Sequence, residues 1–110
     1  MSSPKASPKK VKTYKWDPAR YLKSDKERAA YLEVALEDGD PGVIAAVLGD
    51  IARSKGMARI AKKAGLGRES LYKALSRDGN PKLETLLKIT HALGLRFKVA
   101  VERDKQARAA

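Results

Sequence analysis

The sequence predicts an all-α domain of five to six helices that ends in a short C-terminal strand. Two observations predict the helices: apolar residues recur at intervals of three and four, and capping residues and glycines bound the segments in which they do so. A third observation, the alternation of apolar and other residues near the C-terminus, predicts the strand. The 110 residues suit one such domain with tails.

The first half of the chain contains a short helical turn and a longer helix. Asp17 and Pro18 are suited to the N-cap and the first position of the turn, which we expect to cover one side of the core. The longer helix is predicted from Ser24 or Asp25 to about Asp38. The large apolar residues of the turn are Tyr14, Trp16, Tyr21 and Leu22, and the apolar stripe of the helix consists of Ala29, Leu32, Ala35 and Leu36.

Two further helices show the same boundary signals. One begins at Asp40-Pro41 and runs to about Lys55, and the other begins at Asn80-Pro81 and runs to about Leu93. Glycine follows each of them. The buried face of the first is predicted to hold Ile44, Val47, Leu48 and Ile51, and that of the second Leu83, Leu86, Leu87, Thr90 and Leu93.

Between these helices, residues 56–76 have the pattern of two short helices joined by a tight bend. Where such helices cross, the first needs a small residue, the turn needs a residue that tolerates positive φ, and the second helix needs an aliphatic wedge. Ala61, Gly65 and Leu71 meet these needs in order. Their spacing resembles the helix-turn-helix of phage repressors, although an ordinary helical hairpin in a bundle would also fit.

The charge of the chain favours a polyanionic partner. The net charge is +11: residues 1–15 contribute +5, residues 16–55 contribute −2 and residues 56–110 contribute +8. Nucleic acid is the expected partner and anionic lipid is second. No apolar run could span a membrane and no secretory signal is evident, so we expect a cytoplasmic protein without a membrane partner.

Enzymatic and metal chemistry find little support in the sequence. The chain has no cysteine, and its single histidine, His91, has no nearby pair of acids that would complete a metal site. Its serines have no base at a spacing typical of a catalytic motif. We therefore expect no enzyme, no metal and no cofactor.

If the motif binds DNA, the start of its second helix enters the major groove. Arg68 could then pair with guanine and Glu69 with the amino group of cytosine, although Glu69 could equally favour the positive helix end. Lysines and serines suit phosphates, and each of these side chains could instead be solvated surface. The candidate DNA-binding residues are Lys62, Lys63, Gly67, Arg68, Glu69, Ser70, Tyr72, Lys73 and Ser76.

The two ends of the chain differ from the domain, which we place at residues 16–102. Residues 1–15 are predicted to form a disordered basic arm, which could follow phosphates or remain a solvated tail, and residues 103–110 a charged tail. The predicted strand, Leu95 to Glu102, has no other strand to join. It could pair with its copy in a homodimer or with a partner's sheet edge, through Leu95, Phe97, Val99 and Val101.

Motifs across residues 16–102 resemble a known family. They are Tyr31-Leu32, Asp40-Pro41, Ala45 to Arg53, Gly56-Met57, Gly65-Leu66, Ser70 to Leu75, Gly79-Asn80-Pro81, Thr85 to Lys88 and Leu93-Gly94-Leu95. In this order they resemble the addiction-module antidotes, small bacterial helix-turn-helix proteins similar to the HigA-like antitoxins. The basic arm is longer than expected for that family, and Gly67 stands where a Ser or Thr cap is usual.

The resemblance implies an antitoxin that neutralises a RelE/ParE-like toxin and, as a dimer, represses the shared promoter by binding its operator DNA. A small basic toxin would seek acidic surface, although those acids could simply solvate a helix end. A free-standing phage-repressor-like regulator without a toxin is the alternative, and a structural nucleic-acid binder is a third. The acidic candidates for toxin binding are Glu33, Glu37, Asp38 and Asp40.

Overall fold

The computed structural model describes residues 17–102, and every regular element within them is helical. The elements are the 3-10 turn η1 (Pro18–Tyr21) and the helices α2 (Asp25–Asp38), α3 (Pro41–Lys55), α4 (Met57–Ala64), α5 (Arg68–Ala74) and α6 (Leu83–Ala92). The helical class predicted from the sequence is thus confirmed for this range. The predicted arm, with Tyr14 and Trp16, and the predicted tail lie outside the described residues.

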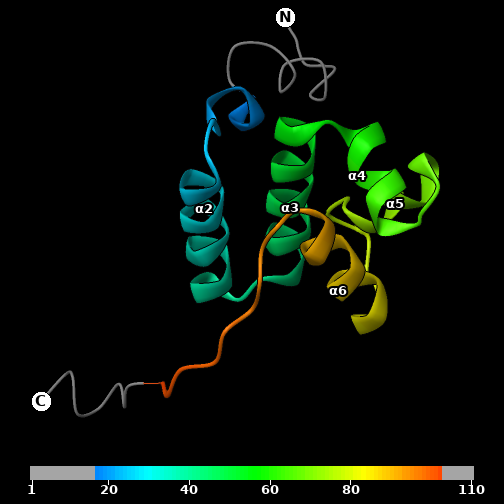
Figure 1. Cartoon of the computed structure of the whole chain (residues 1–110). Coiled ribbons are helices and arrows are strands. Elements are labelled where there is room, and N and C mark those ends of the chain that lie inside the picture. Colours follow the sequence, from blue (N-terminus) through cyan, green and yellow to red (C-terminus); the bar gives the residue numbers. More distant parts are fainter. Residues whose placement is uncertain (1–16, 103–110) are drawn as a thin grey trace, which may run out of the picture.

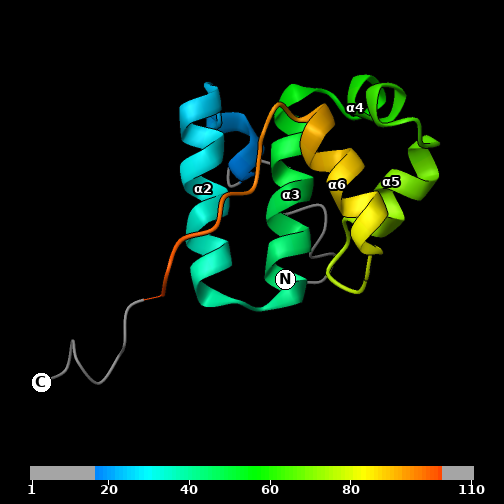
Figure 2. The same ribbon diagram turned by 60° about the horizontal axis from the view of Figure 1, so that its bottom comes forward.

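Helix α3 lies at the centre of the molecule. It packs antiparallel to α2 and also contacts η1 and α4, while α4 contacts α5 and α6 (Figures 1 and 2). The six largest fully buried side chains come from α3 to α6 and the residue that follows: Leu48, Ile51, Ile60, Leu71, Ile89 and Leu93. One core therefore joins the α2–α3 pair to the three shorter helices. No helix of residues 17–102 is long and apolar enough to cross a membrane.

Local hydrogen bonds set the predicted limits of α2 and α3. The Glu27 amide donates to Ser24 Oγ (3.1 Å), which caps α2, and the Glu27 carboxylate accepts from the amide of Lys23 (2.8 Å), the residue before the cap. The Gly42 amide donates to Asp40 Oδ1 (2.9 Å) at the start of α3. Glycines with positive φ follow both helices, and the predicted boundaries are confirmed.

The predicted start of α6 is wrong. The helix begins at Leu83 rather than at Asn80-Pro81, because the chain is still extended at Lys82 (φ −65°, ψ 158°). Gly79 comes so close to the end of α5 that a Cβ there would lie 2.3 Å from the Ala74 carbonyl oxygen. Asn80 and Pro81 therefore lie in the short connection between the turn at residues 75–78 and α6, and Lys82 takes the N-cap position.

Several apolar residues predicted to be buried lie at the surface. Leu83 is 69% exposed and Leu87 is 48% exposed, because Ile89, Thr90 and Leu93 face the core and turn the other side of α6 outward. On α2 the predicted stripe is only half buried. Leu32 and Ala35 are buried, whereas Ala29 and Leu36 are exposed, as is Tyr21 of η1.

The predicted strand is not formed in the single chain. Beyond Gly94 (φ 77°), residues 95–102 carry no strand pairing and run past α2 (Figure 2). Leu95 packs partly against the core, but Val99 is 99% exposed and Val101 is 96% exposed. A strand needs a second strand to satisfy its backbone groups, and within residues 17–102 every regular element is a helix.

Candidate nucleic-acid interface

The bend between α4 and α5 depends on Gly65. Its backbone is left-handed (φ 72°, ψ 30°), a conformation that glycine adopts without the clash a Cβ would cause. The Gly65 amide donates to the Lys62 carbonyl (3.1 Å), and the Leu66 amide donates to the Ala61 carbonyl (2.9 Å). These bonds end α4 and direct the chain into α5 after only three residues.

The residues predicted for the crossing of α4 and α5 are buried, and the two helices contact each other. Ala61 is buried on α4, and Leu71 of α5 is fully buried in the common core. Gly67 begins α5 with an extended backbone (φ −71°, ψ 154°) and no side-chain cap, while its carbonyl accepts from the Leu71 amide (2.9 Å). The requirements for a small contact residue, a glycine turn and an aliphatic wedge are thus all met.

All the predicted DNA-binding residues lie at the surface of this helix pair. Burial of Leu71 fixes the rotation of α5, so Glu69 and Lys73 lie on the side opposite the core. The exposed residues are Lys62, Lys63, Gly67, Arg68, Glu69, Ser70, Tyr72, Lys73 and Ser76. The predicted residues exposed on this helix pair thus include four cationic side chains and one carboxylate.

Helix α5 forms a ridge between two hollows. A hollow of about 510 Å³ lies on the side of Arg68 and Tyr72, and Arg20 and Arg53 line its opposite wall. A second, of about 620 Å³, lies on the side of Ser70, Lys73 and Ser76 and is bounded by the loop at residues 78–81. The outer side of α5, between these open hollows, is therefore accessible to a partner.

Arg68 lies over the ring of Tyr72 on α5. The guanidinium carbon of Arg68 lies 5.9 Å from the centroid of the Tyr72 ring, one helical turn further along α5. At this distance the cation is attracted to the face of the ring. The interaction restricts Arg68 and gives an exposed tyrosine a role on a polar surface.

The sequence does not indicate that Arg20 and Arg53 lie beside α5, because both come from segments far from α5 in the chain. Arg53 donates to Asp17 and, over 2.8 Å, to Asp50 Oδ1, while the Tyr31 hydroxyl donates to Asp50 Oδ2 (2.6 Å). Burial opposes the charge of Arg53, but the two carboxylates outweigh it and raise its pKa. Burial and the bond to Asp50 also raise the pKa of Tyr31. This cluster fixes η1 on α2 and α3.

Two of the predicted DNA-binding residues have structural roles as well. The Ser76 hydroxyl donates to the Lys73 carbonyl (2.9 Å), so it could donate to a phosphate only by giving up that bond. Glu69 lies in the first turn of α5, where a carboxylate favours the positive end of the helix. Their contacts to DNA stay predictions.

Of the acidic residues predicted for toxin binding, Glu33, Glu37 and Asp38 lie on α2, across α3 from α5 (Figure 1), whereas Asp40 lies near the turn that follows α5, since a Cβ at Gly42 would lie 3.1 Å from the Arg77 carbonyl oxygen. Asp40 caps α3, which is a structural use of its carboxylate. Glu33, Glu37 and Asp38 are exposed on α2, and none forms an ion pair within the described residues. His91 is exposed, and residues 17–102 contain no group of three side chains that could hold a metal ion.

Comparison with known proteins places the chain in a family. Residues 12–101 match the model of a family described as "Probable addiction module antidote protein". The chain belongs to this family. An uncharacterized protein of Haemophilus influenzae is 44% identical over 88 residues, which cover 80% of this chain and 91% of that protein. No solved structure matches the chain significantly.

Membership in the antidote family supports the antitoxin role that the sequence motifs imply. An antidote implies a toxin as partner, without specifying which. The match covers η1 to α6 and nearly all of the segment that follows, so the candidate interface and the acidic surface both belong to the family's region.

Proposed function

We propose that this protein is the antitoxin of a toxin–antitoxin module, that it binds and neutralises a RelE/ParE-like toxin, and that it represses their shared promoter as a homodimer. The observation that carries the proposal is the cationic α4–α5 pair in a chain of the antidote family. The pair acts as a helix-turn-helix, with α5 as the recognition helix. The protein acts by binding and is not an enzyme.

In this proposal the two sides of α5 have different roles. Arg68, oriented by Tyr72, donates in parallel to O6 and N7 of guanine, a contact worth about 1 to 3 kcal/mol of discrimination. Lys73, on the outer side of α5, and Lys62 and Lys63 at the end of α4 neutralise phosphates beside the groove. Base contacts determine which DNA sequence is preferred, and phosphate contacts determine the affinity and its salt dependence.

The toxin binds on the acidic surface of α2, which leaves α5 available for DNA. Glu33, Glu37 and Asp38 have no paired cation among the described residues, so they can attract a basic partner. Because α2 and α5 lie on opposite sides of α3, toxin and operator can be bound together (Figure 1).

Co-expression tests this function directly. The product of a toxin-sized reading frame beside the gene is expected to arrest growth alone, and this chain is expected to relieve the arrest and to co-purify with that product. Growth arrest without relief would reject the antitoxin role. A free-standing regulator would bind its operator without any such neighbour, which makes the same experiment decide between the two functions.

A further inference from the structure

The extended segment after α6 exposes apolar side chains and backbone groups that have no pairing strand. Residues 95–102 alternate apolar and other side chains, yet Val99 and Val101 are almost fully exposed. The Leu95 amide donates to the Thr90 carbonyl of α6 (3.0 Å), but residues 96–102 form no backbone pairing with another described element. Extended chain with one apolar face and unpaired donors and acceptors is a template for strand addition.

We infer that this segment pairs antiparallel with its own copy in a second subunit, about a twofold axis at Val99. In this register Arg96 lies opposite Glu102, Phe97 opposite Val101 and Lys98 opposite Ala100. Opposite charges face each other and apolar side chains face apolar side chains, which is the arrangement that stabilises adjacent strands. The segment is therefore complementary to itself.

The neighbouring registers are all less favourable. An axis at Lys98 places that lysine opposite itself, and an axis at Phe97 places Arg96 opposite Lys98; like charges directly opposite destabilise a strand pair. An axis at Ala100 pairs Lys98 with Glu102 and Val99 with Val101, but it leaves Phe97 without an apolar partner among the described residues. Like charges thus exclude Lys98 and Phe97 as centres, and the pairing of Phe97 with Val101 favours Val99 over Ala100.

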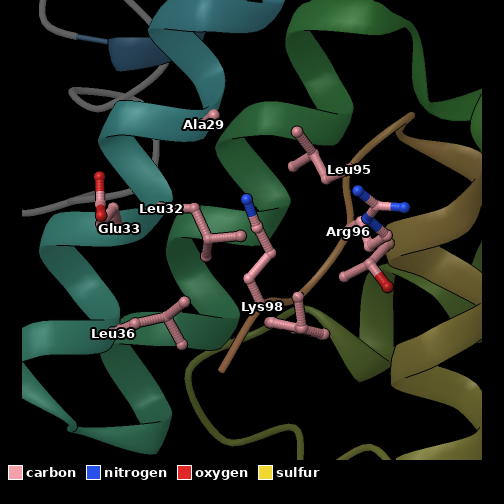
Figure 3. Close-up of a pocket in the computed structure, with 9 residues that line it drawn as sticks. Ala29, Leu32, Glu33, Leu36, Leu95, Arg96 and Lys98 are labelled. Atoms are coloured by element: carbon pink, nitrogen blue, oxygen red, sulfur yellow. The ribbon is translucent and has the colours of Figure 1, made fainter. Parts of the chain in front are cut away.

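Helix α2 offers the surface that a two-stranded ribbon needs for support, since such a ribbon is marginal on its own. A hollow of about 290 Å³ separates the segment from α2, and Leu32 and Leu36 reach into it from the helix (Figure 3). Leu36 is 41% exposed in the single chain. The second strand adds apolar surface beside this hollow, and the segment runs away from α5, so pairing leaves the candidate DNA interface open (Figure 1).

Because the chain has no cysteine, single cysteines report the register directly. Under mild oxidation Val99→Cys is expected to form a disulfide-linked dimer, since directly opposite Cβ atoms lie about 4.5 to 5.5 Å apart. Phe97→Cys is the matched control and is expected to stay unlinked, because its copy lies about 13 Å away along the strands. A mixture of Phe97→Cys and Val101→Cys is expected to cross-link.

Charge reversal provides a second test that does not depend on disulfide geometry. Arg96→Glu is expected to raise the dimer dissociation constant about tenfold in sedimentation experiments, because it faces Glu102 twice per dimer. The double variant Arg96→Glu with Glu102→Arg is expected to restore the original value. If Arg96 acted only within its own chain, the double variant would not restore the dissociation constant.

The outcomes separate this inference from the proposed function, since none of the measurements uses DNA or toxin. A monomeric chain would overturn the inferred strand pairing. So would a dimer in which Val99→Cys forms no disulfide and Arg96→Glu leaves the dissociation constant unchanged. Equal cross-linking at positions 97 and 99 would overturn the register. In each of these cases promoter binding and toxin neutralisation would still be judged on their own experiments.

Discussion

Arg68 is the residue on which recognition of the DNA sequence is expected to depend most. Its side chain begins in the first turn of α5 and lies over the ring of Tyr72, so part of its freedom is already restricted before DNA binds. Its planar guanidinium offers two parallel donors, which match guanine. Lys62 and Lys63 carry compact charges that suit phosphates instead.

Arg68→Ala is expected to weaken binding to the operator by about 1 to 3 kcal/mol and to leave binding to random DNA nearly unchanged, because the substitution removes a hydrogen-bonding partner of a base edge. Fluorescence anisotropy with both duplexes measures the two affinities. Lys26→Ala removes the same charge from the exposed start of α2 and serves as the control. Equal weakening on both duplexes would show that Arg68 binds only phosphate.

Adding a side chain at two glycines near α5 is expected to change the free energy of unfolding in opposite directions. A Cβ at Gly79 would lie 2.3 and 2.7 Å from the carbonyl oxygens of Ala74 and Lys73, so Gly79→Ala should lower the free energy of unfolding by about 1 to 3 kcal/mol. A Cβ at Gly67 meets nothing closer than 4.0 Å, and serine there caps α5. Gly67→Ser should therefore raise that free energy by a few tenths of a kcal/mol. Urea unfolding measures both changes, and a Gly79→Ala variant as stable as the parent would refute the clash.

At the scale of elements, α2 and α3 were predictable because their signals are local. A capping side chain, a first-turn proline or acid and a closing glycine all lie within a few residues of the boundary they set. Helix α6 has apolar residues on two faces, so periodicity alone did not show that Ile89 is buried while Leu83 and Leu87 are exposed. The alternation at residues 95–102 predicted a strand, but the single chain forms none there, because a strand needs a second strand to pair with.

Reversing the charge of α2 is expected to slow toxin binding. The triple variant Glu33→Lys, Glu37→Lys and Asp38→Lys should lower the association rate about tenfold at low salt, with a smaller effect at high salt, because steering is screened. A triple variant with Gln, Gln and Asn at these positions should lie between it and the parent. Operator affinity should be kept or slightly raised. An unchanged association rate at low salt would place the toxin elsewhere.

At the scale of the whole molecule, charge is divided between surfaces. Residues 16–55 carry a net −2, whereas residues 56–110 carry +8, and the α4–α5 surface lies within the basic part. The residues of that surface could be predicted because the motif spans only 21 positions. The sequence could not predict that Arg20 and Arg53 line the hollow beside Arg68 and Tyr72, because the packing of η1 against α3 brings them there.

Removing residues 1–12 tests the basic arm, which we expect to bind phosphates. The truncated chain should bind operator and random DNA more weakly by similar factors, and the slope of log affinity against log salt should become shallower by about 0.9 for each phosphate that the arm neutralises. The truncation removes four of the five lysines in residues 1–15. An unchanged slope would mean that the arm takes no part in binding.

We propose that α5 reads a specific sequence in the promoter of its own gene. A competition titration of the purified chain on that promoter duplex and on a shuffled duplex of equal length, at physiological salt, measures this specificity. We predict at least about 1,000-fold tighter binding to the promoter, as expected for a specific DNA-binding protein. Equal affinity for the two duplexes would contradict this claim and would leave only a non-specific nucleic-acid binder.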